Sequence, residues 1–89
     1  MDKYKVDFKP SVEKDFDRLP DSMLQRVMEH IEQLESNPFP IGSIKLSFAE
    51  KLYRIRVGDY RIVYDVNTIS KTVVIHYVRH RREVYRTVK

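Results

Sequence analysis

Three arginines lie close together in the second half of the chain, and the first two are separated by a single apolar residue. Arg54 and Arg56 alternate with apolar residues, and Arg61 follows the turn signal Gly58-Asp59. In a β-strand, a period of two places alternate side chains on the same face. A hairpin would therefore gather the three guanidinium groups on one surface. Because clustered like charges repel, such a surface is typical of proteins that bind a polyanion, and the planar guanidinium suits phosphate.

A second interpretation of these arginines needs no ligand. Outward-facing strand residues are commonly solvated, and the three side chains could pair separately with Asp59, Asp65 or Glu83. The pattern alone leaves both interpretations open.

The basic cluster near the C-terminus contains a candidate general base. His80 lies beside Arg79, Arg81 and Arg82. Neighbouring positive charge favours the neutral imidazole, which accepts a proton near neutral pH. His80 is therefore a candidate base for proton-transfer chemistry.

Other residues with chemical potential have simpler interpretations. Tyr85 could stack on a nucleobase, but it could equally anchor the core, and we expect His30 and His76 to be structural. The three histidines show no metal-ligand spacing and cysteine is absent, so we expect no metal and no cofactor. With Gly42 and Gly58 as the only glycines, no glycine-rich phosphate loop is present.

The N-terminal half predicts one strand and two helices. Alternation of apolar and charged residues from Tyr4 to Phe8, ended by Pro10, predicts a half-buried strand. Apolar residues then recur at helical spacing over 12–18, with Ser11 as a plausible N-cap, and again over 24–34. The two helices, separated by Pro20, would form a helical hairpin whose apolar stripes need a sheet to cover.

The C-terminal half predicts that sheet. Residues 37–50 indicate a loop with a short extended piece around 44–48, and 52–57, 60–66 and 72–79 predict three strands joined by short turns. Short turns imply antiparallel pairing. The tail over 80–89 is expected to be a short helix or irregular. The expected fold is α+β, with the N-terminal strand and helical hairpin packed on an antiparallel sheet, in a single domain over 1–89.

Composition narrows the function class. The absence of cysteine excludes disulfides, and without a signal-peptide pattern or an apolar span we expect a cytoplasmic protein. Residues 1–44 hold six Lys/Arg against nine Asp/Glu, a net charge of −3, whereas 45–89 hold eleven against four, a net of +7. Seven of those eleven are arginine, so the second half is the expected functional half.

The hairpin over 52–64, with the sequence LYRIRVGDYRIVY, resembles the signature hairpin of the RelE/ParE toxin superfamily, and of its RelE-type members in particular. Lys45-Leu46 before the hairpin and the segment 79–85 after it extend the resemblance over nearly the whole chain. The resemblance implies a RelE-like microbial RNase fold. It also implies a type II toxin that cleaves messenger RNA in the ribosomal A site, beside the 16S rRNA, and so inhibits translation.

By position, the resemblance assigns roles to individual residues. Arg61 matches the phosphate-stabilising arginine, Arg79 the second catalytic arginine, and Tyr85 the aromatic that orients the substrate. The implied reaction is metal-free attack of the ribose 2′-hydroxyl on the neighbouring phosphate. The remaining basic residues that the resemblance places at the RNA are Arg54, Arg56, Arg81, Arg82 and Lys45.

The general base is the point at which this chain departs from the family pattern. Some members carry lysines where this chain has Arg54 and Arg56, and one of these lysines is a proposed base. An arginine is not readily deprotonated. His80, a ribosomal or substrate group, or catalysis by orientation and charge stabilisation alone are the alternatives.

The same resemblance leaves rival functions open. A ParE-like toxin shares the fold but inhibits DNA gyrase, and a module without catalytic activity would bind only nucleic acid or a partner protein. The presence of Arg61, Arg79 and Tyr85 favours RNA cleavage. The implied partner is an acidic RelB-type antitoxin, partly disordered when free, in a hetero-oligomeric complex that binds operator DNA.

Overall fold

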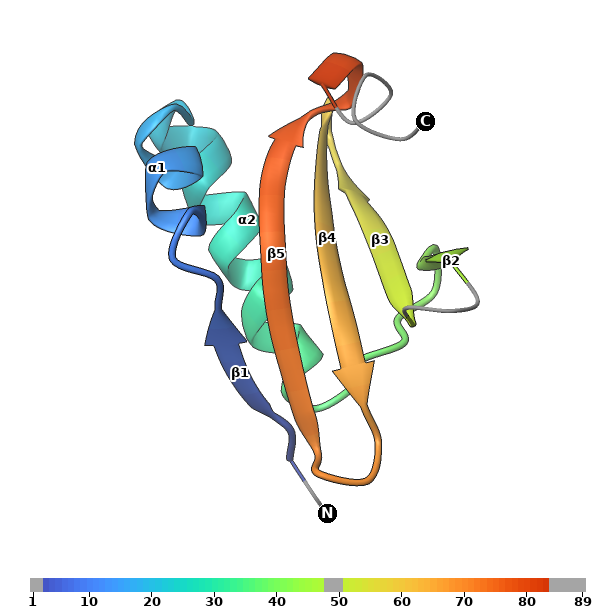
Figure 1. The fold of residues 1–89 in the computed structure, drawn as a ribbon. Coiled ribbons are helices and arrows are strands. Elements are labelled where there is room, and N and C mark those ends of the chain that lie inside the picture. The colour runs from blue at the N-terminus through green and yellow to red at the C-terminus, as the bar shows by residue number, and fades with distance from the viewer. Residues whose placement is uncertain (1–2, 48–50, 84–89) are drawn as a thin grey trace.

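The computed structural model describes residues 3–47 and 51–83. A single sheet carries two helices on one of its faces (Figure 1). The elements follow one another as β1 Lys5–Phe8, α1 Val12–Asp17, α2 Asp21–Leu34, β2 Ile44–Ser47, β3 Leu52–Val57, β4 Tyr60–Asn67 and β5 Thr72–His80. The α+β fold class is therefore as predicted, and the helix and strand positions agree with the sequence pattern to within a few residues.

The sheet has the strand order β1-β5-β4-β3-β2. The pairs β2–β3, β3–β4 and β4–β5 are antiparallel, as the short turns predict, but β1 joins the edge of the sheet parallel to β5. The sheet is thus mixed, and the N-terminal strand is part of it rather than packed upon it. The alternation in residues 4–8 predicts a strand, but it carries no information on which strand becomes its neighbour.

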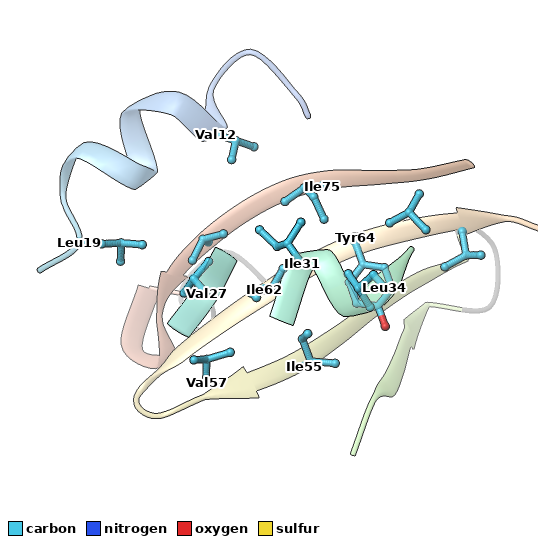
Figure 2. Packing of buried hydrophobic residues seen from close by; sticks show 13 residues of the cluster. Val12, Leu19, Val27, Ile31, Leu34, Ile55, Val57, Ile62, Tyr64 and Ile75 are labelled. Atoms are coloured by element: carbon cyan, nitrogen blue, oxygen red, sulfur yellow. The ribbon is translucent and has the colours of Figure 1, made fainter. Parts of the chain in front are cut away.

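The hydrophobic core lies between α2 and the inner face of the sheet. Val27, Ile31 and Leu34 recur along one side of α2 and are buried. Figure 2 shows these side chains against residues of β3, β4 and β5, including Ile55 and Ile62. Burial of this apolar area is the main driving force for folding, at roughly 25 cal/mol per Å².

The short helix α1 begins after Ser11, which occupies the N-cap position as predicted. Its side chain makes no capping hydrogen bond, and its backbone has the helical values φ −70° and ψ −15°. Val12, fully buried, attaches α1 to the core instead (Figure 2). Packing rather than capping therefore holds this helix.

The loop between α2 and β2 is tied to the sheet by aromatic side chains. The Tyr64 hydroxyl donates a hydrogen bond of 2.8 Å to the Pro38 carbonyl, and Phe39 packs edge-on against Tyr53 with ring centroids 5.1 Å apart. Burial raises the pKa of Tyr64 to about 12, an effect that a side-chain hydrogen bond with Ser43 partly offsets. These contacts place the start of β2 beside β3.

The turn between β3 and β4 requires glycine. Gly58 has φ +59°, and a Cβ at this position would lie 3.1 Å from the Cε atom of Met23. Positive φ is natural at the first central position of a two-residue hairpin turn. The tight turn fixes the register of the two arginine-bearing strands.

Within the described residues, the helices are too short or too polar to cross a membrane.

Candidate nucleic-acid interface

Three arginines form a row across three neighbouring strands. The register pairs Arg56 of β3 with Arg61 of β4, and Arg61 with Arg79 of β5. Residues directly opposite one another in a sheet point to the same face, about 5 Å apart. This face lies opposite the one that α1 and α2 cover. We call it the arginine face, defined by Arg54, Arg56, Arg61 and Arg79.

Arg61 lies at the centre of the row but is buried, with 4% of its surface exposed. Its Nη1 group donates hydrogen bonds to the carbonyls of Gly58, at 3.2 Å, and Tyr60, at 3.0 Å. The sequence predicts that three guanidinium groups share one surface, and the register places Arg61 on that face, but the Arg61 side chain is buried. The side chain folds back toward the β3–β4 turn, where the carbonyls of the tight turn supply acceptors.

Arg54 occupies the next row on the arginine face. Its cross-strand partner is Val63, which in turn pairs with Tyr77. The Arg54 Nη1 atom is buried and has no hydrogen-bond partner among residues 3–47 and 51–83. An unmet donor of this kind costs roughly 1–3 kcal/mol, so it lowers the stability of the free protein.

Arg79 is held from two sides. Its guanidinium carbon lies 4.5 Å from the centre of the Tyr77 ring, a cation–π contact, and its Nε atom lies 3.9 Å from an oxygen of Asp15. Its side chain is 30% exposed. Arg79 therefore combines an ordered position with access to solvent.

Arg81 and Arg82 begin a helical turn directly after β5 and are exposed. The Arg81 backbone N–H donates a hydrogen bond of 2.8 Å to the Asp59 carbonyl. This bond holds the basic turn beside the β3–β4 hairpin turn, at the end of the sheet where the arginine row lies. Tyr85 lies outside the described residues.

Two further residues predicted for the site lie away from the arginine face. Lys45 is exposed on the edge strand β2, and its cross-strand partner Tyr53 packs against the core, so Lys45 belongs to the helix-side face. His80 pairs with Tyr60, also packed against the core, with ring centroids 5.5 Å apart. The structure thus brings Arg54, Arg56, Arg61 and Arg79 together on one face without Lys45 or His80.

The ring of His80 already uses one nitrogen. The Arg82 backbone N–H donates to His80 Nδ1 at 3.2 Å, so Nδ1 is the acceptor nitrogen and the proton of a neutral ring lies on Nε2. The nitrogen that a general base would use is engaged by the backbone. The geometry gives no support to His80 as the base, and that assignment stays a prediction.

Two carboxylates near this site have roles that the sequence pattern does not disclose. Asp65 accepts a hydrogen bond from His76 Nε2 at 2.6 Å, which makes it the partner of a histidine rather than of an arginine. A β-bulge between Ile75 and Val78 places both His76 and Tyr77 on the arginine face. Asp15 is 5% exposed and joins α1 to β5. A bulge and a helix-to-strand contact have no signal in local periodicity.

The side chains that could ligate a metal ion are dispersed in the described part of the chain. Among residues 3–47 and 51–83, histidine, aspartate and glutamate nowhere form a group of three that could hold an ion. The chemistry that the arginine face offers is cationic: it can bind phosphate and stabilise negative charge.

Known proteins resemble this chain over most of its length. Residues 6–85 match the family described as the ParE toxin of type II toxin–antitoxin systems, parDE. Toxin RelE3 of Methanocaldococcus jannaschii is 32% identical over 85 residues, covering 91% of this chain and 94% of that protein. Toxin RelG of Mycobacterium tuberculosis is 31% identical over 84 residues, covering 93% and 97%.

The fold comparison points the same way. RelE in the archaeal RelE–RelB complex from Pyrococcus horikoshii matches with a TM-score of 0.80 and 34% identity, covering 89% of this chain and 96% of that one. Sequence, fold and an arginine-rich hairpin therefore agree. The chain belongs to the ParE toxin family of type II toxin–antitoxin systems, within the RelE/ParE superfamily.

Proposed function

We propose that this protein is a RelE-type toxin that cleaves messenger RNA in the ribosomal A site and so blocks translation. The observation that carries the proposal is the row of Arg56, Arg61 and Arg79 across three strands, with the unmet Arg54 donor in the next row. Like charges directly opposite one another destabilise a sheet. Binding of a polyanion such as RNA relieves this repulsion, and the relief contributes to the free energy of binding.

The proposed reaction is metal-free attack of a ribose 2′-hydroxyl on the adjacent phosphate. The O2′–P bond forms, the P–O5′ bond breaks, the hydroxyl proton leaves to a base, and the 5′-oxygen takes up a proton. Arg61 and Arg79 stabilise the charge that develops on the phosphorane oxygens. Arg54 and Arg56 hold the neighbouring phosphates, and Tyr85 orients the substrate, as its position in the family pattern implies.

The arginine face does not itself supply the general base that takes the proton of the 2′-hydroxyl. Arginine stays protonated, and the Nδ1 atom of His80 is engaged on the other face of the sheet. We propose that this chain acts chiefly by orienting the 2′-hydroxyl and stabilising charge, with the proton passing to a ribosomal or substrate group. Orientation alone supplies several kcal/mol of catalysis in well-aligned systems, on the order of 7–11 kcal/mol at most.

The proposed partners follow from the charge of the surface. An acidic RelB-type antitoxin would neutralise the arginine face and compete with RNA for it. The solved relatives from Pyrococcus horikoshii and Mycobacterium tuberculosis are complexes of a toxin with its antitoxin. We propose an equivalent hetero-oligomer here, which also binds operator DNA.

Induced expression tests the proposal. Growth arrest is expected together with message 5′ ends inside codons, mapped on ribosomes, and Arg61→Ala/Arg79→Ala should abolish both. The matched control is Lys14→Ala/Arg26→Ala, which removes two cations from the helices on the opposite face and should leave cleavage intact.

Two other outcomes of this experiment would contradict the proposal. Arrest with intact messages would replace the proposal by gyrase inhibition, the activity of ParE-like toxins. Binding of RNA without arrest or cleavage would leave a binding module.

A further inference from the structure

The outer edge of β5 changes its neighbour halfway along the strand. β1 pairs with Thr72–Ile75, and the last bond of this pairing runs from the Lys9 N–H to the Ile75 carbonyl at 2.9 Å. Beyond that point α1 takes the place of a strand (Figure 1). The Val78 N–H points to this outer edge and needs an acceptor, which Asp15 Oδ2 supplies at 3.1 Å.

The second oxygen of the same carboxylate faces Arg79. Asp15 Oδ1 lies 3.9 Å from Arg79 Nε. Because the Val78 bond fixes one oxygen, the other is fixed relative to the neighbouring residue of the strand. Tyr77 covers one face of the same guanidinium, at 4.5 Å. Among the residues that the structure describes, these contacts leave the two Nη groups of Arg79 as donors for a phosphate.

A purely structural role would not require a charged residue at this position. One acceptor oxygen suffices to satisfy the Val78 N–H, and an amide or hydroxyl could provide it. A carboxylate that is 5% exposed carries a desolvation penalty unless an opposite charge is near. Arg79 is the cation that the structure places beside Asp15.

We propose that Asp15 is a positioning residue that sets the orientation of the Arg79 guanidinium for the scissile phosphate. The inference rests on the proposed RNA cleavage and deepens it, since it places a functional carboxylate on α1, outside the basic half of the chain. Asp15 acts through Arg79 and does not touch the substrate.

Asp15→Asn tests the proposal, because its amide oxygen can still accept from Val78 while the charge facing Arg79 is lost. Single-turnover cleavage on programmed ribosomes should show a maximal rate lowered about tenfold, with the half-saturating toxin concentration changed less than twofold. Asp17→Asn, an exposed aspartate on the same helix, should cleave at the wild-type rate. In an Arg79→Lys background, Asp15→Asn should lower the rate by less than twofold, since the coupled group is already altered.

A structural readout separates this inference from the proposed function. The Arg79 Nε–Hε resonance in ¹⁵N-labelled protein should shift in Asp15→Asn and stay unchanged in Asp17→Asn. If the wild-type protein does not cleave but the Arg79 resonance still shifts in Asp15→Asn, the RNase proposal is refuted and the contact between Asp15 and Arg79 is kept. Wild-type cleavage by Asp15→Asn, or a full tenfold loss in the Arg79→Lys background, would overturn the positioning role. If Asp15→Asn does not fold, Asp15→Glu, which keeps the charge, replaces it. The positioning role is then tested by the Arg79 resonance and the cleavage rate of that variant.

Discussion

Replacing Arg54 by methionine should stabilise the toxin and slow the proposed RNA cleavage. The Arg54 Nη1 atom is buried with no acceptor among the described residues, and an unmet buried donor costs roughly 1–3 kcal/mol. Methionine keeps the long apolar stem and removes both this donor and one charge of the arginine face. Taking the lower end of that range, we expect the free energy of unfolding to rise by about 1 kcal/mol. For a domain of this size, 1 kcal/mol corresponds to a melting temperature about 4–8 °C higher.

The assay pairs thermal and urea unfolding with ribosome-dependent cleavage of a message. Arg54→Met should melt at the higher temperature and cleave at least tenfold more slowly, because the proposed phosphate contact would be lost. Arg54→Lys is the matched control, since it keeps the charge and should gain no comparable stability. A melting temperature below that of the wild type would show that the guanidinium has an acceptor in solution, and the reasoning would fail.

Three further predictions concern the core, the loop anchor and the surface charge. The pKa of Tyr64 is raised from 10.0 to about 12. The contribution of the neutral Tyr64 hydroxyl to the free energy of unfolding is therefore complete below pH 10 and is lost as the pH rises toward 12. Urea titrations should show a loss of about 1.4 kcal/mol per pH unit in that window, and Tyr64→Phe should lack this component. Leu34→Ala, at a fully buried position, should lower the free energy of unfolding by about 2–5 kcal/mol in urea, and a loss under about 1 kcal/mol would contradict the packing. Arg56→Gln, on an exposed residue, should reduce by about 0.7 the slope of log K against log salt for single-stranded RNA, measured by anisotropy; an unchanged slope would remove Arg56 from the phosphate contacts.

The elements of this fold could be predicted because their signals are local. The alternation of residues 52–57 and 60–66 gives both strand identity and the face of each side chain, and the Gly58-Asp59 turn fixes the register. The shared face of Arg54, Arg56 and Arg61 follows from these facts alone. The apolar stripe of residues 24–34 likewise identifies the face of α2 that meets the sheet.

The features that the sequence did not predict depend on contacts between distant segments. The parallel pairing of β1 with β5 joins residues about seventy positions apart, which no local period can indicate. The contact of Asp15 with Val78 has the same origin, since an aspartate on a polar-looking helix is expected in solvent. The burial of Arg61 depends on the carbonyls of the turn that it folds against, and the Asp65–His76 pair depends on a bulge in β5.

The arginine face couples stability to binding. The donor of Arg54 and the row of like charges lower the stability of the free protein, and a polyanion bound on this face would reduce the repulsion within the row. An acidic antitoxin segment on this face would therefore raise the melting temperature of the toxin as it blocks RNA, by an amount that grows with the ratio of its concentration to its Kd. Residues that are unfavourable in the folded toxin alone would then be favourable in either of the two proposed complexes, with RNA or with an antitoxin. The same reasoning explains why Arg54→Met is expected to separate the two properties, with a more stable protein that binds both RNA and antitoxin less tightly.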